Sequence, residues 1–561
     1  MKLSAFSLAL ALAASPAVAD LNAGAYLAAR SAGLASDYEE AARYYTRALI
    51  DDRSNPVLLE STANAYVGLG DVDRAVPIAR RLIETGQTSQ TANLVMVTDA
   101  AKRGAWDGMI ADFEAGQSVG PLFDGLAKAW ALVGAGQMGD ALAAFDDVAD
   151  NRGVEAFGLY HKALALAYVG DFEGADRILS GDEGTEMRLM RRGVVAFATI
   201  LSQTDQNDAA LDLINATFGD DLDPALTSLR DTLEAGAVAP FTAITQASDG
   251  IAEVMFSIGA ALSGEATPAY TLLYTRLALA LRPDHTEAIL LTAELLEDLE
   301  SYGLATEVYD AVPQDDPSYH AAELGRANAL ERAGDTDAAV EVLTQLTQTH
   351  ADLPAVHIAL ADTLRRQERY GEASPVYDRA IELLGEAQQS HWVVHFARGI
   401  THEREDRWEM AEADFRKALD LNPGQPQVLN YLGYSFVEMG TNMDEALDLI
   451  EQAVEARPDS GFITDSLGWA LYRLGRYNEA VVHMERAVEL EAVDPIINDH
   501  LGDVYWAVGR HREAEFQWHR ALSFEPEEED AERIRRKLEV GLDVVLEEEG
   551  APALRMANDD G

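Results

Sequence analysis

Alanine and glycine recur at a nearly constant interval in the second half of this 561-residue chain. Two alanine series keep steps of 34 residues, and a glycine series has steps of 35 and 34: Ala446, Ala480 and Ala514; Ala453, Ala487 and Ala521; Gly433, Gly468 and Gly502. A period of 34 residues is the length of one helix–turn–helix unit in a tandem array. The period also favours partner binding over catalysis, because stacked units present a long concave surface.

The residue types within one period explain the spacing. Counted from Pro495, the small residues Gly502 and Ala514 fall at positions 8 and 20, where the two helices approach closely. Trp518, at position 24, fills the remaining space between them. This arrangement resembles the tetratricopeptide repeat (TPR), which implies an all-α fold, a right-handed TPR superhelical solenoid. About fourteen repeats are expected, six before residue 223 and eight after residue 250.

The repeat frame and its interruptions predict the domain organisation. Residues 223–250 contain prolines and glycines out of step with the repeats, which suits an irregular connector or hinge between two arrays. After residue 528 an amphipathic pattern predicts a capping helix, which the end of a solenoid needs. The expected segments are a signal peptide at 1–19, a degenerate N-terminal array at 20–222, the connector at 223–250, a C-terminal array at 251–528, the capping helix at 529–550 and a disordered tail at 551–561.

The first nineteen residues have the pattern of a secretory signal. Lys2 precedes an apolar run, and Ala17-Val18-Ala19 matches a cleavage site. The chain contains no cysteine, which excludes disulfides, thiol catalysis and a lipidated cysteine anchor. No later apolar run is long enough to span a membrane. We therefore expect a soluble periplasmic protein, with secretion left open.

The charge is strongly acidic. Asp and Glu number 96 against 43 Lys and Arg, a formal net charge of −53. Such a surface repels phosphate backbones and anionic headgroups, so nucleic acid and anionic lipid are disfavoured as ligands. The acidity is explained by solubility, or by attraction of a basic partner.

Motifs that carry chemistry are weak in this sequence. Gly134, Gly136 and Gly139 match G-x-G-x-x-G, but they fall between two predicted helices and no strand precedes them. His391 and His395 are spaced i, i+4 on a predicted helix and could ligate zinc, although the glutamate of a metalloprotease motif is missing. We predict no catalytic residue, no metal site and no cofactor, and therefore no enzyme.

The strongest candidate site is the inner face of the last three repeats. In this fold the first helix of each repeat lines the concave groove, and aromatic residues with one arginine gather there. Tyr, Trp and Arg are enriched at binding hot spots, although the same aromatics could pack as ordinary core. The predicted partner-binding residues are Asn430, Tyr434, Phe462, Asp465, Trp469, Tyr472, Arg473, Asp499, Asp503 and Trp506. TPR domains that clamp a terminal carboxylate use Lys and Asn in this groove, whereas this chain has Asp465 and Asp499 at the corresponding positions. An apolar or basic segment of a partner therefore fits better than a terminal carboxylate.

Residues 426–522 carry the strings NYLGYSF, DSLGWALYRLGRYNEAV and HLGDVYWAVGRHREAEFQWHRAL. They resemble the C-terminal repeats of envelope TPR proteins of Gram-negative bacteria, some of which are adaptors for a carboxyl-terminal processing protease. The resemblance implies a non-catalytic periplasmic adaptor or scaffold that binds partner proteins along its concave surface. A structural assembly factor for an envelope or export complex is an alternative, and a metal-dependent hydrolase on a solenoid scaffold is a remote one. The sequence leaves the oligomeric state undetermined.

Overall fold

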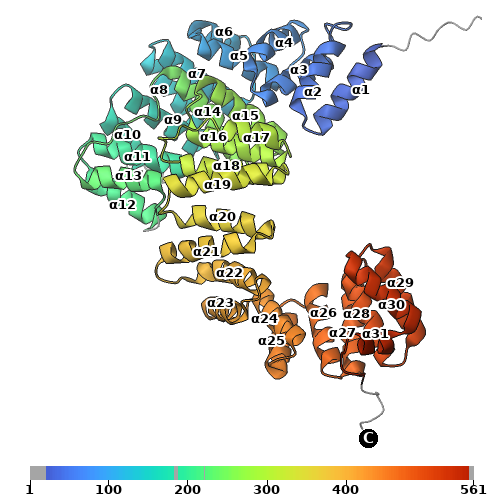
Figure 1. Ribbon diagram of the computed structural model, residues 1–561. Coiled ribbons are helices and arrows are strands. Elements are labelled where there is room, and N and C mark those ends of the chain that lie inside the picture. The colour runs from blue at the N-terminus through green and yellow to red at the C-terminus, as the bar shows by residue number, and fades with distance from the viewer. Residues whose placement is uncertain (1–20, 182–186, 220–221, 555–561) are drawn as a thin grey trace, which may run out of the picture. The chain divides into compact units, whose positions relative to one another are not determined.

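A computed structural model describes residues 21–181, 187–219 and 222–554. All regular structure in these residues is helical, as the sequence predicts, and consecutive helices pack as antiparallel pairs (Figure 1). The chain divides into two compact units, Met1–Thr349 (unit 1) and His350–Gly561 (unit 2). The predicted signal peptide, residues 1–19, lies outside the described residues.

Unit 1 contains α1 to α19. Their bounds are α1 (Leu21–Leu34), α2 (Tyr38–Ala48), α3 (Pro56–Leu69), α4 (Val72–Glu84), α5 (Gln90–Lys102), α6 (Trp106–Glu114), α7 (Pro121–Gly134), α8 (Met138–Ala149), α9 (Glu155–Tyr168), α10 (Phe172–Leu179), α11 (Arg191–Gln203), α12 (Asn207–Phe218), α13 (Pro224–Glu234), α14 (Ala247–Leu262), α15 (Pro268–Leu281), α16 (Thr286–Asp298), α17 (Tyr302–Tyr309), α18 (Tyr319–Arg332) and α19 (Thr336–Thr349).

Unit 2 contains α20 to α31 and one short 3-10 helix, η1. Their bounds are α20 (Pro354–Arg366), α21 (Tyr370–Leu384), η1 (Gln389–His391), α22 (Trp392–Arg404), α23 (Trp408–Leu421), α24 (Pro426–Met439), α25 (Met443–Ala456), α26 (Gly461–Arg473), α27 (Tyr477–Leu490), α28 (Pro495–Ala507), α29 (His511–Ser523), α30 (Glu528–Val540) and α31 (Leu542–Glu548).

The small residues of the repeat lie where the two helices of a pair meet. Ala480 and Ala514 are fully buried. A Cβ placed on Gly468 would lie 2.7 Å from Met484, and one on Gly502 would lie 2.4 Å from the Trp518 ring. Because both contacts are shorter than packing allows, glycine at this position lets the large side chain of the second helix lie against the first.

Local signals set the helix ends. In α28, Pro495 occupies the first turn and the Asp494 carboxylate accepts a hydrogen bond from the Ile497 N–H at 2.9 Å, an N-cap. The chain turns after this helix at Gly509, whose φ of +80° favours glycine. A short turn then starts the second helix of the pair, so the helix–turn–helix unit follows from the sequence of one repeat.

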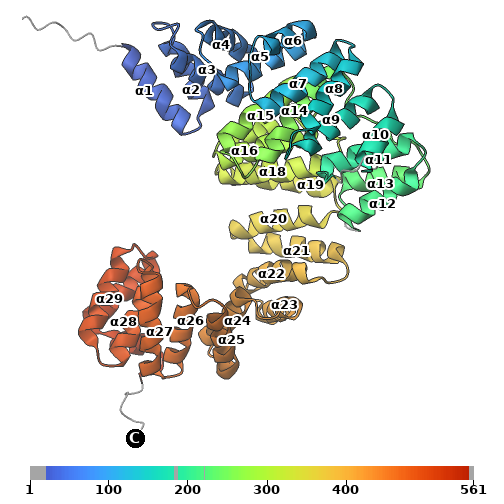
Figure 2. The same ribbon diagram turned by 180° about the vertical axis from the view of Figure 1, so that it is seen from behind.

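In unit 1 the concave face of the N-terminal repeats is filled by the chain itself. Helix α14 packs against α5, α7 and α9, and α15 packs against α3 and α5. The partners α3, α5, α7 and α9 are the first helices of four successive pairs, so they are the ones that would line an open groove. Figures 1 and 2 show α14 and α15 beside these helices from opposite sides. All residues of α14 are buried except the last three.

Specific contacts hold α14 and α15 in this position. A Cβ on Gly250 would lie 2.1 Å from the Trp130 ring, so glycine is required where α14 crosses α7. The Trp130 Nε1–H donates to His161 Nδ1 at 3.1 Å, and the other ring nitrogen of His161 lies 3.2 Å from Ser257 Oγ on α14. Burial lowers the pKa of His161 to about 4, so the imidazole is neutral. From α15, Arg276 Nε donates to the Gly68 carbonyl at 3.0 Å.

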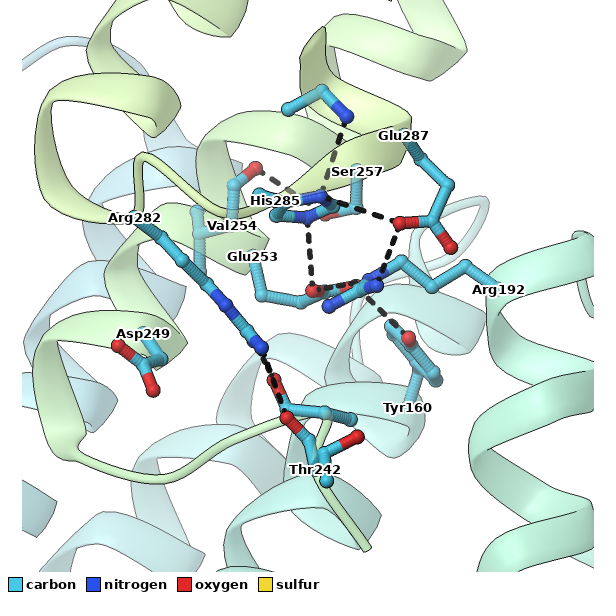
Figure 3. A network of polar contacts seen from close by, with 12 residues as sticks. Tyr160, Arg192, Thr242, Asp249, Glu253, Val254, Ser257, Arg282, His285 and Glu287 are labelled. Atoms are coloured by element: carbon cyan, nitrogen blue, oxygen red, sulfur yellow. Dashed lines mark hydrogen bonds and ion pairs between the residues drawn. The ribbon is translucent and has the colours of Figure 1, made fainter. Parts of the chain in front are cut away.

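A buried ionic network connects α14 to α9 and α11 and to the start of α16 (Figure 3). The Glu253 carboxylate, almost fully buried, accepts from Arg192 Nε at 2.7 Å and from the Tyr160 hydroxyl at 2.9 Å. Arg192 Nη1 also donates to Glu287 at 2.9 Å, and His285 lies 3.5 Å from Glu253. Burial raises the pKa of Glu253, but Arg192 and His285 outweigh burial and hold that pKa well below its usual range.

The predicted connector at 223–250 lies inside unit 1 and includes α13 and the start of α14. Its irregular part is anchored, because the Ala239 N–H donates to Ser202 Oγ at 2.8 Å and Arg282 Nη2 donates to the Thr242 carbonyl at 3.0 Å. Ala239 and Ile244 are buried. The division between the two compact units falls after Thr349, outside this segment.

The predicted capping helix at 529–550 is two helices, α30 and α31. The break is at Gly541, whose φ is +87°, and the Trp506 ring packs against this glycine. Residues 551–554 of the predicted disordered tail are described and line a cavity in unit 2. The rest of that tail, 555–561, lies outside the described residues.

Candidate functional site

The inner face of unit 2 contains two adjoining cavities, which we call together the unit 2 groove. The first has a volume of about 630 Å³ and lies between α26, α28 and the cap α30–α31. The second has a volume of about 580 Å³ and lies between α22, α24 and α26. Tyr434, Glu438, Ile496 and His500 line both, so the cavities are continuous along the first helices of the repeats. Each volume is in the range of ligand pockets.

Nine of the ten predicted binding residues line this groove. Three line only the second cavity, five line only the first, and one lines both: Asn430, Phe462 and Asp465; Trp469, Tyr472, Arg473, Asp499 and Asp503; Tyr434. The repeat register therefore places these side chains on one surface, although they come from three different repeats. That they bind a partner stays a prediction.

Trp506 lies outside both cavities, contrary to the expectation that it faces the groove. Its Nε1–H donates to Asp543 on α31 at 2.9 Å, and its ring stacks on His511 with centroids 4.2 Å apart. A Cβ on Gly541 would lie 2.7 Å from the ring. The cap covers this last repeat, so Trp506 serves to dock the cap.

Trp469 is the centre of an aromatic stack on α26. Its ring lies 4.8 Å from Tyr472 and 4.0 Å from the imidazole of His500, both nearly parallel. The indole Nε1–H donates to Glu438 at 2.7 Å, which fixes the ring plane. Stacked rings contribute about 0.5–1.5 kcal/mol beyond the burial of their area, so the stack holds a flat apolar wall at the groove.

His500, which the sequence did not single out, links the stack to a carboxylate. Its Nδ1 lies 3.0 Å from Asp465 Oδ2. Burial lowers the pKa of His500, but Asp465 and the nearby Asp499 and Asp503 outweigh burial and raise that pKa overall. Asp465 is therefore partly neutralised by a neighbour from the next repeat.

The cap supplies cations that neutralise two of the predicted acidic residues. Lys537 on α30 is fully buried, and its Nζ lies 2.7 Å from Asp499 Oδ2 and 2.6 Å from Asp503 Oδ1. Arg533 Nη1 lies 3.6 Å from Asp503 Oδ2. The Trp518 Nε1–H also donates to Asp503, at 2.9 Å. These aspartates therefore hold the cap in place, and the first cavity is less acidic than the sequence indicates.

The second cavity keeps its acidic and apolar character. Its charged lining among the described residues consists of four carboxylates and two basic side chains: Glu403, Asp406, Glu438 and Asp465; Arg404 and His500. Three large apolar side chains remain exposed at the groove: Phe462 at 56%, Ile496 at 48% and Met439 at 42%. Exposed apolar groups gathered in a concavity with carboxylates around them are typical of a protein-binding surface.

The histidines considered for zinc are arranged differently from the prediction. His391 lies in η1, ahead of α22, so it does not share a helical face with His395. His395 Nδ1 lies 3.1 Å from Asp414, which also accepts from Arg398 at 2.7 Å. His402 is buried 3.7 Å from the same carboxylate. The described residues contain no group of three or more His, Cys, Asp or Glu suited to a metal ion.

No helix in the described part of the chain has the length and hydropathy that crossing a bilayer requires.

Comparison with known proteins gives matches to repeats in both units. Three sequence models described as tetratricopeptide repeat match residues 26–90 and 324–390, 392–425, and 463–492. None of the three describes a catalytic family.

Curated relatives match over part of their length. A TPR repeat-containing protein of Pseudomonas aeruginosa is 26% identical over 160 residues, which is 28% of this chain and 26% of that protein. A protein of Haemophilus influenzae named lipoprotein NlpI homolog is 30% identical over 127 residues, 22% of this chain and 40% of that protein. Human tetratricopeptide repeat protein 13 is 26% identical over 192 residues, 33% and 22% of the two chains. The chain thus spans less than half the length of these relatives.

Solved structures of repeat proteins are also similar. The hetero-tetramer Cut9–Hcn1 of the APC/C matches with 15% identity and a TM-score of 0.38, covering 93% of this chain and 97% of that chain. The MamA protein matches with 18% identity and a TM-score of 0.28, covering 31% and 93%. The similarity of this chain to repeat proteins is therefore judged from the three sequence models and from the helix pairs. The described residues are all-α, and residues 26–90, 324–390, 392–425 and 463–492 are similar to tetratricopeptide repeats.

Proposed function

We propose that the protein is a non-catalytic adaptor that captures an extended segment of a partner protein in the unit 2 groove. Tetratricopeptide repeats serve as protein-binding scaffolds, usually through their concave face. The observation that carries the proposal is the contrast between the two units. The N-terminal repeats of unit 1 enclose α14 and α15, whereas the groove of unit 2 retains exposed Phe462 and Ile496.

The chemistry of the groove supports an apolar segment with basic residues. Phe462, Met439 and Trp469 offer apolar contact area. Glu403 and Asp406 line the second cavity and would attract Lys or Arg side chains. The formal net charge of −53 would speed encounter with a basic partner at low salt.

The proposal extends to location and partner. The signal-like residues 1–19 support export to the periplasm, and the strings within 426–522 support the resemblance to envelope adaptors. A carboxyl-terminal processing protease is therefore the first partner to test. The match to a relative named a lipoprotein is compatible with an envelope role.

Site-specific photo-crosslinking in cells tests this function. Benzoylphenylalanine placed at Phe462 reports on the groove, and the same group at Phe516, 62% exposed on the second helix α29, is the matched control. We expect the protease to crosslink at 462 and not at 516. Crosslinks to stable envelope subunits alone would favour the assembly-factor alternative, and equal crosslinking at both positions would contradict binding in the groove.

A further inference from the structure

The end of the described chain lies in the unit 2 groove. After α31 ends at Glu548, the chain turns, and the Ala551 N–H donates to the Leu546 carbonyl at 2.8 Å. The four residues Ala551–Leu554 then line the first cavity together with Trp469 and Tyr472. Leu554 is half-buried and packs against the hydrophobic core of unit 2. The segment therefore occupies part of the surface that the proposed function assigns to a partner.

The point where this segment leaves the cap is held by an ion pair. Arg533 on α30 donates to the Glu549 carboxylate at 2.8 and 3.2 Å, and both residues line the first cavity. Arg533 also lies 3.6 Å from Asp503 at the floor of the groove. Because Arg533 links the cap to the floor of the groove, residues 551–554 enter the first cavity at a fixed position.

We propose that residues 551–554 are a built-in occupant of the unit 2 groove, which a partner segment must displace. This inference rests on the proposed function. The occupant also indicates the kind of segment that fits: Ala-Pro-Ala-Leu is apolar, consists mostly of small residues and lies outside any helix. Proline fixes φ and removes a donor, so it favours an extended backbone that lies against an aromatic wall. The partner is thus a protein with an exposed extended segment rich in Ala, Pro and Leu.

Tethering makes even a weak occupant effective. A short linker gives an effective concentration on the order of 1 mM. A segment with an intrinsic Kd of about 0.1 mM would then occupy the cavity most of the time and weaken a competitor about tenfold. Removal of the segment should therefore increase partner affinity by about this factor.

A peptide with the chain's own sequence provides the probe. A fluorescently labelled peptide of residues 550–561 is titrated by anisotropy into the full chain and into a chain that ends at Gly550. We expect the shortened chain to bind the peptide at least tenfold more tightly than the full chain. The full-length variant Leu554→Asp, which keeps every residue of the cap, should fall between them. Equal binding by the full and shortened chains, or no binding by the shortened chain, would overturn the proposal.

Two variants of the shortened chain locate the binding. Trp469→Ala should weaken peptide binding about tenfold, whereas Phe516→Ala on α29 should leave it unchanged. Loss of binding in both variants to the same extent would place the peptide elsewhere and also overturn the proposal. Circular dichroism checks that each chain is folded. If the shortened chain does not bind the peptide but a partner still crosslinks at Phe462, the proposal of a built-in occupant fails and the proposed adaptor function stands. If the shortened chain binds the peptide but no partner crosslinks at Phe462, the occupant of the groove is supported and the proposed adaptor function fails.

Discussion

The indole of Trp469 on α26 lies parallel to the imidazole of His500 on α28, with ring centroids 4.0 Å apart and planes 14° apart. His500 also lies 3.0 Å from Asp465 on α26, so one ring joins two repeats by a stack and an ion pair. His500 therefore links α26 and α28 at the wall of the groove.

The stability of unit 2 should fall as pH rises through the neutral range. Burial lowers the pKa of His500, but Asp465 and its neighbours outweigh burial and raise it above the usual 6.5. A raised folded pKa means that protonated His500 stabilises the fold below about pH 6.5, and that this stabilisation is lost as pH rises through the folded pKa. Urea unfolding between pH 5.5 and 8.5 measures the effect. His500→Gln should show a flatter pH dependence, and an unchanged slope would contradict this account.

Phe462→Ala should weaken partner binding about tenfold while the free energy of unfolding changes by less than about 0.5 kcal/mol. Phe462 is 56% exposed, so its truncation removes groove surface without opening a core cavity. Phe516→Ala, 62% exposed on α29, is the control and should leave binding unchanged. Isothermal titration with the crosslinked partner's segment measures affinity. Equal losses in both variants would argue against the groove.

Lys537→Met should destabilise the cap by about 3–5 kcal/mol. Lys537 is fully buried between Asp499 and Asp503, and its loss leaves two carboxylates in a low-dielectric site without their main cation. Combining it with Asp499→Asn and Asp503→Asn should recover much of the stability, because the uncompensated charges are removed. Hydrogen exchange in α30 and urea unfolding measure the change. A triple variant no more stable than Lys537→Met would show that charge is not the cause.

Glu253→Gln should destabilise unit 1 by about 3–5 kcal/mol at pH 7, since it leaves Arg192 buried without its main partner. Arg192 and His285 outweigh burial and hold the pKa of Glu253 below its usual range, so the stabilisation is present above about pH 4.5 and is lost as pH falls through the folded pKa. Acid unfolding followed by circular dichroism should therefore be less steep in the variant. Glu265→Gln, at an exposed position, is the control and should behave as wild type.

Gly250→Ala should destabilise unit 1 by about 1–3 kcal/mol, because the new Cβ would lie 2.1 Å from the Trp130 ring where α14 crosses α7. Gly108→Ala is the control. It lies within α6 with nothing within 4 Å of a new Cβ, and it should stabilise by up to about 1 kcal/mol through helix propensity. Thermal unfolding compares the two. A neutral Gly250→Ala would contradict tight packing of α14 in the groove.

Much of the local structure was predictable because a repeat is a local unit. The small residues at positions 8 and 20 and the large one at 24 set the packing of each helix pair, as Gly502, Ala514 and Trp518 show. The described residues contain six helix pairs from α1 to α12 and, leaving out the cap, eight from α14 to α29; this is the expected number, although the first of the eight begins at Ala247. The register of the first helices likewise placed nine candidate residues on the groove.

Contacts between distant segments were not predictable in the same way. Trp506 and Asp503 occupy groove positions in the repeat frame, yet both contact the cap, whose Lys537 was one polar residue among many in an amphipathic pattern. These contacts depend on the position of the cap against the last repeat, and the periodic pattern of the sequence does not predict that position.

The sequence by itself determined the helix pairs, their order and the aromatic face of the last repeats, since these depend on residues at most one repeat apart. The tertiary structure alone decided that α14 and α15 fill the concave face of the N-terminal repeats, and that residues 551–554 lie in the groove of unit 2. The physical reason is that the curvature of a solenoid accumulates from small rotations between many repeats. The accumulated rotation decides whether a segment of the same chain fits into the groove, and the sequence of a single repeat does not contain this information.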